Sequence, residues 1–166
     1  MSCLAVVLSH CGSGVTGNGS VHGRSFVAKS GGAVVHKLTG NPGPDGVLWD
    51  LQASNTDGVC NALAHPSPQR TDTQLIDIDL LTFPALRIGD YPISLPSQAP
   101  RETFPVVTAV YAEPDYHSHM NLIIDADTGR ATITAVDDSH IAGTATLSFG
   151  EEHVILNFDL PVCRTD

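Results

Sequence analysis

Basic residues are scarce in this chain of 166 residues. Eight lysines and arginines stand against eighteen aspartates and glutamates, which gives a formal net charge of −10. Nucleic acids and anionic membranes are bound through clusters of positive side chains, so the sequence argues against both as partners. The acidic residues are scattered, with no run longer than two, which is typical of a solvated surface that keeps a domain soluble.

Long apolar runs and catalytic signatures are also missing. No stretch of about 18 apolar residues is present, so the sequence predicts no transmembrane helix. The nearest string to a Gly-x-Ser-x-Gly nucleophile motif is at residues 12–14, with no expected strand before it. A phosphate-binding Gly-x-x-x-x-Gly-Lys motif is absent, and no pair of cysteines has Cys-x-x-Cys spacing. Nothing in these patterns indicates a particular reaction.

Alternation of apolar and polar residues dominates the last fifth of the chain, residues 129–163. A period of two is typical of antiparallel strands that bury one face. The alternation falls into three runs of residues. Short spacers rich in aspartate, glycine and glutamate separate these runs and have the length of hairpin turns. We therefore expect a closing three-stranded meander that buries Ile141, Gly143, Ala145, Leu147 and Phe149, and then Val154, Leu156, Phe158 and Leu160.

Alternating runs also occur in the part of the domain before residue 129. In the cleanest upstream strand, Ile76, Ile78 and Leu80 share one face, and Asp77 and Asp79 share the other. Glycine- and proline-rich turns at regular spacing predict an all-β domain, an antiparallel β-sandwich of about nine or ten strands rather than a closed barrel. The expected strands before the meander are at 19–28, 33–38, 47–51, 74–81, 91–95, 106–112 and 118–125. The strand at 91–95 contains Pro92, which suits an edge of a sheet.

One short helical turn is expected at residues 59–64, and it carries Cys60. In an exported domain, Cys60 and Cys163 are expected to form a disulfide. Closing a loop of about 100 residues would stabilise the fold by roughly 4–5 kcal/mol on the chain-entropy model. The alternative is two buried free thiols.

The N-terminus resembles the end of a bacterial lipoprotein signal. Leu8-Ser9-His10-Cys11 has the form of a lipobox, with Cys11 as the lipidated residue and a Gly/Ser tether after it. Two features depart from that pattern: His10 replaces a small residue, and the apolar run is shorter than the usual core of about 7–15 residues. A start codon placed too late would explain both, whereas the alternative is a cytoplasmic N-terminus. We expect residues 1–18 to be a leader remnant and tether, and residues 19–163 to be the domain.

Two local patterns are candidate metal sites. His117 and His119 lie two residues apart, so on an extended strand both imidazoles project from the same face and can share a metal such as zinc. Solvent-facing histidines at the start of a strand are the alternative. Asp125 and Asp127 resemble the opening of a calcium loop, but the remaining ligands of an EF-hand are absent, and a hairpin turn suits them equally well.

Several further segments together resemble a diffuse group of uncharacterised bacterial β-sandwich proteins that are secreted or lipid-anchored. These segments are Gly19-Ser-Val-His-Gly-Arg-Ser-Phe-Val-Ala, the region after Cys60, Gly89-Asp-Tyr-Pro-Ile, and the ending Asn157-Phe-Asp-Leu-Pro-Val-Cys163. The likeness covers residues 19–163. It implies an envelope location and a disulfide, and it implies no activity.

The sequence therefore predicts an exported, non-enzymatic module of the bacterial cell envelope or surface, which binds a partner or has a structural role. Its ligand stays open. One alternative is an extracellular metal-dependent enzyme that uses the strand of His117 and His119. Another is a small-lipid carrier, which requires the strands to close into a barrel with an apolar lumen.

Overall fold

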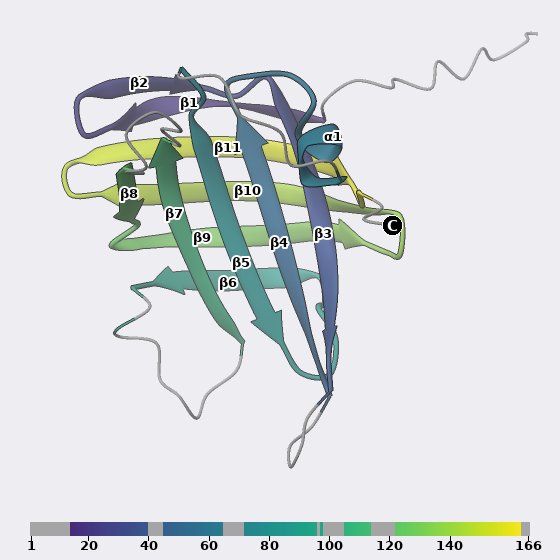
Figure 1. Cartoon of the computed structure of the whole chain (residues 1–166). Helices are drawn as coiled ribbons and strands as arrows, with labels where there is room; N and C mark the ends of the chain where they lie inside the picture. Colours follow the sequence, from purple (N-terminus) through teal and green to yellow (C-terminus); the bar gives the residue numbers. More distant parts are fainter. Residues whose placement is uncertain are drawn as a thin grey trace, which may run out of the picture.

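Two antiparallel sheets packed face to face form the structure, a computed structural model that describes residues 14–39, 45–64, 72–95, 97, 105–113 and 122–163. In Figure 1 the strands of the nearer, five-stranded sheet run across those of the six-stranded sheet behind it. The order of strands is β2-β1-β11-β10-β9-β6 in one sheet and β3-β4-β5-β7-β8 in the other. The predicted β-sandwich is confirmed, and the described strands do not close into a barrel.

Eleven strands and one helix occur in the described part of the chain. The six-stranded sheet consists of β1 (Val15–Val21), β2 (Arg24–Val27), β6 (Gly89–Ser94), β9 (Thr128–Val136), β10 (His140–Phe149) and β11 (Glu152–Pro161). The five-stranded sheet consists of β3 (Ser30–Leu38), β4 (Gly46–Ser54), β5 (Leu75–Thr82), β7 (Val106–Glu113) and β8 (Leu122–Asp125). The helix α1 spans Val59–Ala64, as the sequence predicts.

The closing meander forms as expected. Strand β10 pairs with both β9 and β11, and the residues predicted to face inward on β10 and β11 are buried. Strand β6 contains Pro92 and lies at the edge of its sheet, where the missing proline N–H is not needed for pairing. Both predictions succeeded because alternation and proline chemistry act locally.

The start of the domain differs from the prediction in two ways. Residues 15–18, expected in a tether, belong to β1, which pairs with β11 inside the six-stranded sheet, so the domain begins before residue 19. The single strand expected at 19–28 is a hairpin, because His22 and Gly23 turn the chain between β1 and β2. Both residues have positive φ angles, 54° and 76°, as a tight two-residue hairpin turn requires. This turn explains why the strand count exceeds the predicted nine or ten.

The core lies between the two sheets. It is built from the inward faces of both, and Trp49 is only 6% exposed within it. The largest fully buried side chains are Tyr111, Phe26, Ile76, Ile78, Leu80, Ile133, Ile141, Leu147, Leu156, Leu160, Val21 and Val107. On β5, Ile76, Ile78 and Leu80 are buried, which leaves Asp77 and Asp79 on the outer face of the five-stranded sheet.

Candidate functional site

Three aspartates meet at the centre of that outer face. Asp50 on β4 lies directly opposite Asp79 on β5, and Asp77 lies two residues from Asp79 on the same side of β5. One carboxylate oxygen from each lies within 4.8 Å of the others. Asp50 and Asp77 are half-buried, and Asp79 is the most exposed of the three. We call Asp50, Asp77 and Asp79 the acidic cluster.

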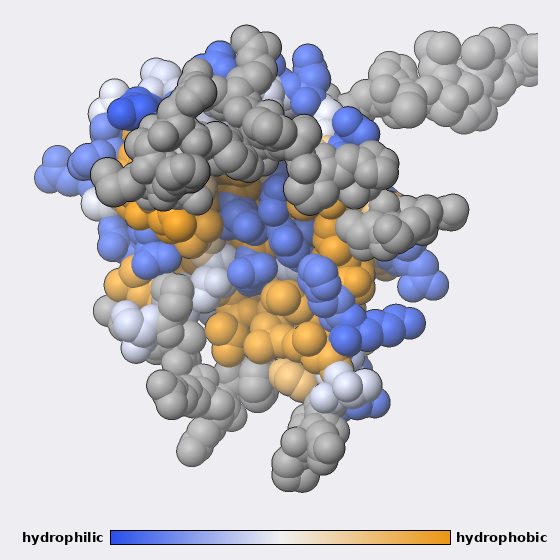
Figure 2. All heavy atoms as spheres, in the orientation of Figure 1, coloured by the Kyte–Doolittle hydropathy of each residue, from blue (hydrophilic) through white to orange (hydrophobic). Residues whose placement is uncertain are grey.

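Apolar side chains border the acidic cluster. The strand register places Val34 beside Asp50, Val110 beside Asp77, and the opposed pair Leu48 and Leu81 one step further along β4 and β5. Figure 2 shows hydrophilic residues gathered at the middle of this face, with hydrophobic residues around them. Gln52 lies opposite Asp77 and Thr108 opposite Asp79. The face therefore presents negative charge within an apolar surround.

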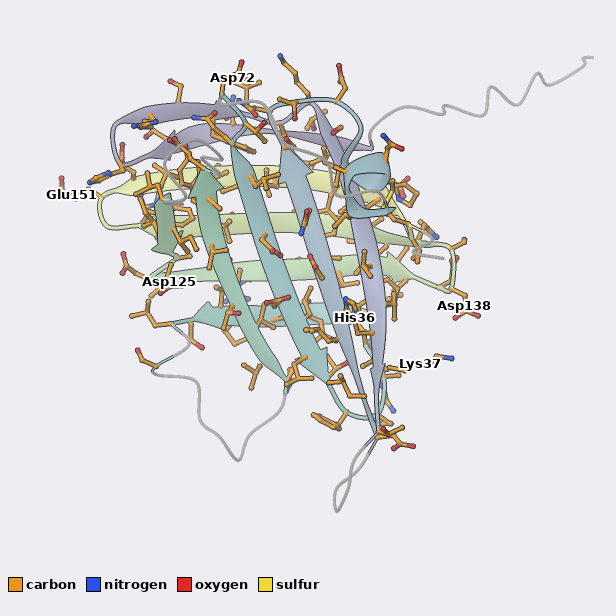
Figure 3. The ribbon with its side chains drawn as sticks, in the orientation of Figure 1. His36, Lys37, Asp72, Asp125, Asp138 and Glu151 are labelled. Carbon is orange, nitrogen blue, oxygen red and sulfur yellow. A yellow bond between two sulfur atoms is a disulfide. The ribbon has the colours of Figure 1, made fainter. Side chains whose placement is uncertain are left out.

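Several acidic residues outside the acidic cluster lie far from the middle of the sheet face. Figure 3 shows Asp72, Asp125, Asp138 and Glu151 around the margin of the molecule, and His36 on the neighbouring strand β3. The His36 charge lowers the pKa of Asp79, but burial and the nearby Asp50 dominate and raise that pKa overall. The local environment of Asp79 thus opposes its ionisation.

Burial has its largest effect on Asp77. Loss of solvent raises its pKa to about 8, and the charges of Asp50 and Asp79 act in the same direction, while Gln52 opposes them. At neutral pH the Asp77 carboxyl therefore retains its proton. The Oδ1 atoms of Asp50 and Asp77 are buried and have no hydrogen-bond partner among the described residues. A proton held between the two carboxyl groups satisfies both oxygens.

The oxygen ligands of the acidic cluster are of the type preferred by hard cations such as Ca²⁺. Three carboxylates supply only part of the six to eight oxygen ligands, roughly, that Ca²⁺ takes. A proton and a cation compete for the same oxygens, because coordination requires the ionised form of Asp77.

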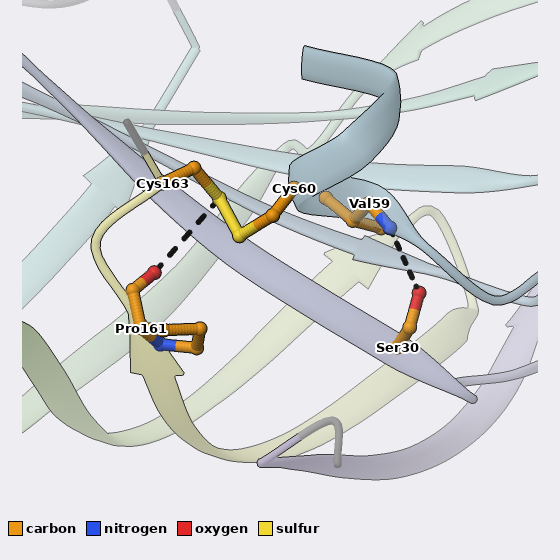
Figure 4. Close-up of a disulfide and its surroundings, with 5 residues drawn as sticks. All are labelled: Ser30, Val59, Cys60, Pro161 and Cys163. Carbon is orange, nitrogen blue, oxygen red and sulfur yellow. Dashed lines mark hydrogen bonds between the residues drawn. A yellow bond between two sulfur atoms is a disulfide. The ribbon is translucent and has the colours of Figure 1, made fainter. Parts of the chain in front are cut away.

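The disulfide Cys60–Cys163 lies against this sheet, with a Cα–Cα distance of 5.1 Å. Figure 4 shows it joining α1 to the segment after β11, across β3. The Cys163 N–H donates to the Ala33 carbonyl oxygen at 2.7 Å, and the Val59 N–H donates to Ser30 Oγ at 3.4 Å. A Cβ placed on Gly32 would lie 2.4 Å from Cys163 Sγ. The disulfide thus covers β3 at Gly32, which lies opposite Gln52 of β4.

A polar network joins the two sheets at another margin. Arg24 on β2 forms an ion pair with Glu113 on β7, and the buried Tyr111 hydroxyl donates to the same carboxylate. The Gln74 side-chain amide donates to the Tyr111 hydroxyl at 2.9 Å. Burial and the Glu113 carboxylate raise the pKa of Tyr111. Arg24, Gln74 and Glu113 line a polar cleft of about 280 Å³ together with Asn55, Asp72 and Thr73.

The structure describes some of the residues of the two metal sites predicted from the sequence, but not all of them. His117 and His119 lie outside the described residues, and so does Cys11. Of the calcium-loop candidates, Asp125 is exposed at the end of β8. Asp127 accepts a hydrogen bond from the Gly150 N–H at 2.5 Å, so its carboxylate ties the link between β8 and β9 to the turn between β10 and β11. Because β8 and β9 lie in different sheets, this link is a crossover between the sheets and not the hairpin turn that the sequence offered as an alternative. The closed barrel on which the lipid-carrier alternative depends is not formed, because the described strands make two open sheets.

Sequence reasoning found two members of the acidic cluster and missed the third. Alternation placed Asp77 and Asp79 on one face of β5. Asp50 lies in the strand expected at residues 47–51, between the apolar residues Trp49 and Leu51. Only the pairing of β4 with β5 brings Asp50 opposite Asp79. The available signal was a lone acid on an otherwise apolar strand.

Comparison with protein families, curated proteins and solved structures finds no match for this chain. Within the described ranges, no helix is long and apolar enough to cross a membrane.

Proposed function

We propose that this chain is a non-enzymatic module of the cell envelope or surface that binds a basic protein partner through the outer face of its five-stranded sheet. The observation that carries the proposal is the acidic cluster at the centre of that face. The net charge of −10 favours approach of a positive partner from a distance.

The chemistry of the face suits a lysine or arginine side chain. Such side chains have an aliphatic stem and a charged head, and they bury the stem against apolar surface while the head meets an opposite charge. Leu48, Leu81 and Val110 offer the apolar surface, and Asp79, the most exposed residue of the acidic cluster, offers the charge. A flat sheet face with this pattern favours a macromolecular partner.

The cluster also costs folding free energy, which supports a role in binding. Like charges directly opposite each other on neighbouring strands are destabilising, and Asp50 and Asp79 are such a pair. Local violations of good packing and electrostatics concentrate at functional sites. Neutralisation by a partner would relieve the repulsion, so partner binding and folding stability act together.

An extracytoplasmic location is part of the proposal. The disulfide Cys60–Cys163 supports it, since structural disulfides persist in oxidising compartments. Lipid attachment at Cys11 and kinship with secreted or lipid-anchored bacterial β-sandwich proteins remain proposals that rest on the sequence pattern.

The test measures binding of a fluorescent oligolysine peptide by anisotropy at low salt. We expect saturable binding, weakened about fivefold by Asp79→Asn, because one partly exposed charge pair is worth up to about 1 kcal/mol. The matched control is Asp138→Asn, which removes the same charge from the exposed turn between β9 and β10. The affinity should also rise with pH through about 8, as Asp77 loses its proton.

Two outcomes would contradict the proposal. Equal weakening by Asp79→Asn and Asp138→Asn would show that the peptide responds to net charge alone. Saturable Ca²⁺ binding by calorimetry, lost in Asp79→Asn and accompanied by no peptide binding, would make the acidic cluster a cation site instead of a docking face.

A further inference from the structure

A second cleft lies at the end of the sandwich where β5 leads towards β6. Its volume is about 340 Å³, which is within the range of small-ligand sites. In Figure 1 the end of β5 and strand β6 both lie towards the lower part of the molecule. Six residues line the cleft: Thr82, Phe83, Ala85, Arg87, Tyr91 and Pro105.

The walls of this cleft are held in place by hydrogen bonds. The Tyr91 hydroxyl donates to the Arg87 carbonyl oxygen at 2.6 Å and accepts from the Arg87 N–H at 3.1 Å. Tyr91 is itself 9% exposed, so its ring anchors the segment between β5 and β6 on the core. Phe83, Ala85 and Pro105 supply apolar surface. A cleft fixed in this way loses little entropy when a ligand enters it.

Arg87 differs from the other arginines in the described ranges. Arg24 pairs with Glu113, and Arg130 pairs with Asp90 at 3.2 Å. The Arg87 side chain is exposed at the cleft and has no carboxylate partner among the described residues. A guanidinium that pairs with none of the described carboxylates is available to bind an anion.

We propose that this cleft binds a small organic carboxylate with an aromatic or aliphatic body. The body packs against Phe83, Ala85 and Pro105, and the carboxylate receives charge-assisted hydrogen bonds from Arg87. This site is separate from the acidic cluster and takes ligands of the opposite charge. It does not depend on the proposed docking of a basic partner.

The test uses phenylacetate as the probe and two-dimensional amide NMR as the readout. We expect saturable shifts of the amide resonances of Phe83, Ala85 and Tyr91, with an affinity about tenfold weaker in Arg87→Gln. Phenylacetamide, which has the same body without charge, should bind at least about tenfold more weakly than phenylacetate. Lys29→Gln is the matched control, because it removes an exposed positive charge at another place in the fold. The Lys29 backbone N–H donates to the carbonyl oxygen of Ser54, the last residue of β4.

The outcomes that overturn the proposal are distinct. Equal shifts with phenylacetamide would show that Arg87 takes no part, and an absence of saturable shifts would show that the cleft binds no such ligand. Equal weakening in Arg87→Gln and Lys29→Gln would reduce the effect to net charge. Asp79→Asn should bind phenylacetate as the unsubstituted protein does, so this test and the oligolysine test fail independently.

Discussion

Asp50 and Asp79 face each other directly across two neighbouring antiparallel strands, on the side of the sheet that points away from the core. A cross-strand pair of this kind normally joins opposite charges or apolar side chains. Here two acids are opposed, and a third, Asp77, lies beside them. Burial and the charges of Asp50 and Asp79 raise the pKa of Asp77, so the protonation of this face depends on pH.

Asp77→Asn should change how stability depends on pH. The folded protein holds a proton on Asp77 up to about pH 8, while the unfolded chain releases it near the ordinary aspartate pKa of 3.8. Between these values the folded state binds more protons, so this group's contribution to stability is complete at acid pH and is lost as pH rises. The unfolding free energy should fall with a slope of at most about 1.4 kcal/mol per pH unit from one group.

Urea unfolding across this pH range, followed by Trp49 fluorescence, measures the effect. The difference between the unsubstituted protein and Asp77→Asn isolates the one carboxyl, because the contributions of other groups cancel. Asp138→Asn should retain the full slope. A pH dependence that is identical in the unsubstituted protein and in Asp77→Asn would show that the Asp77 proton is not held by the fold.

Gly32→Ala should destabilise the protein through the disulfide. The added Cβ would lie 2.4 Å from Cys163 Sγ and 2.8 Å from Cys60 Sγ, closer than atoms can pack. Accommodating it shifts α1 or the segment after β11, at a cost of about 1–3 kcal/mol. In the Cys60→Ala/Cys163→Ala background the sulfur atoms are gone, and the same substitution should cost less than about 1 kcal/mol. Unfolding free energies of the four proteins give the coupling, and purely additive costs would contradict this explanation.

Tyr111→Phe should cost more stability than Arg24→Gln, although both touch the carboxylate of Glu113. The Tyr111 side chain is fully buried, and its hydroxyl both donates to Glu113 and accepts from Gln74, so its loss leaves buried groups unpaired at about 1–3 kcal/mol. The Arg24 side chain is 57% exposed, and exposed ion pairs contribute about 0–1 kcal/mol. Denaturant unfolding ranks the two variants, and the reverse order would show that the ion pair dominates.

Much of the fold was predictable because its signals are local. The alternation from Ile141 to Leu160 specifies which side of each strand is buried, and the hairpin spacers specify that neighbouring strands pair. Pro92 predicts an edge strand because it lacks an N–H group. The disulfide Cys60–Cys163 followed from cysteine count and an expected compartment, and the structure confirms the bond.

The acidic cluster and the first hairpin were harder to predict. Asp50 and Asp79 are distant in sequence, and their opposition depends on the register of β4 against β5, which no local pattern specifies. The turn at His22 and Gly23 was missed because histidine is an infrequent residue at positive φ, so His-Gly is a weaker turn signal than Asn-Gly. The cleft near Arg87 brings together segments on either side of β6, a relationship that appears only when the sheets pack.

Strand β1 lies between β2 and β11, so the earliest described strand completes its hydrogen bonding only with the latest one. A ribosome delivers these partners at opposite ends of synthesis. Until β11 emerges, β1 has β2 as its only hydrogen-bonded neighbour among the described strands, and Cys60 has no Cys163 to join. The six-stranded sheet can therefore be completed only after β11 has been synthesised, which makes this pairing one of the most non-local in the fold.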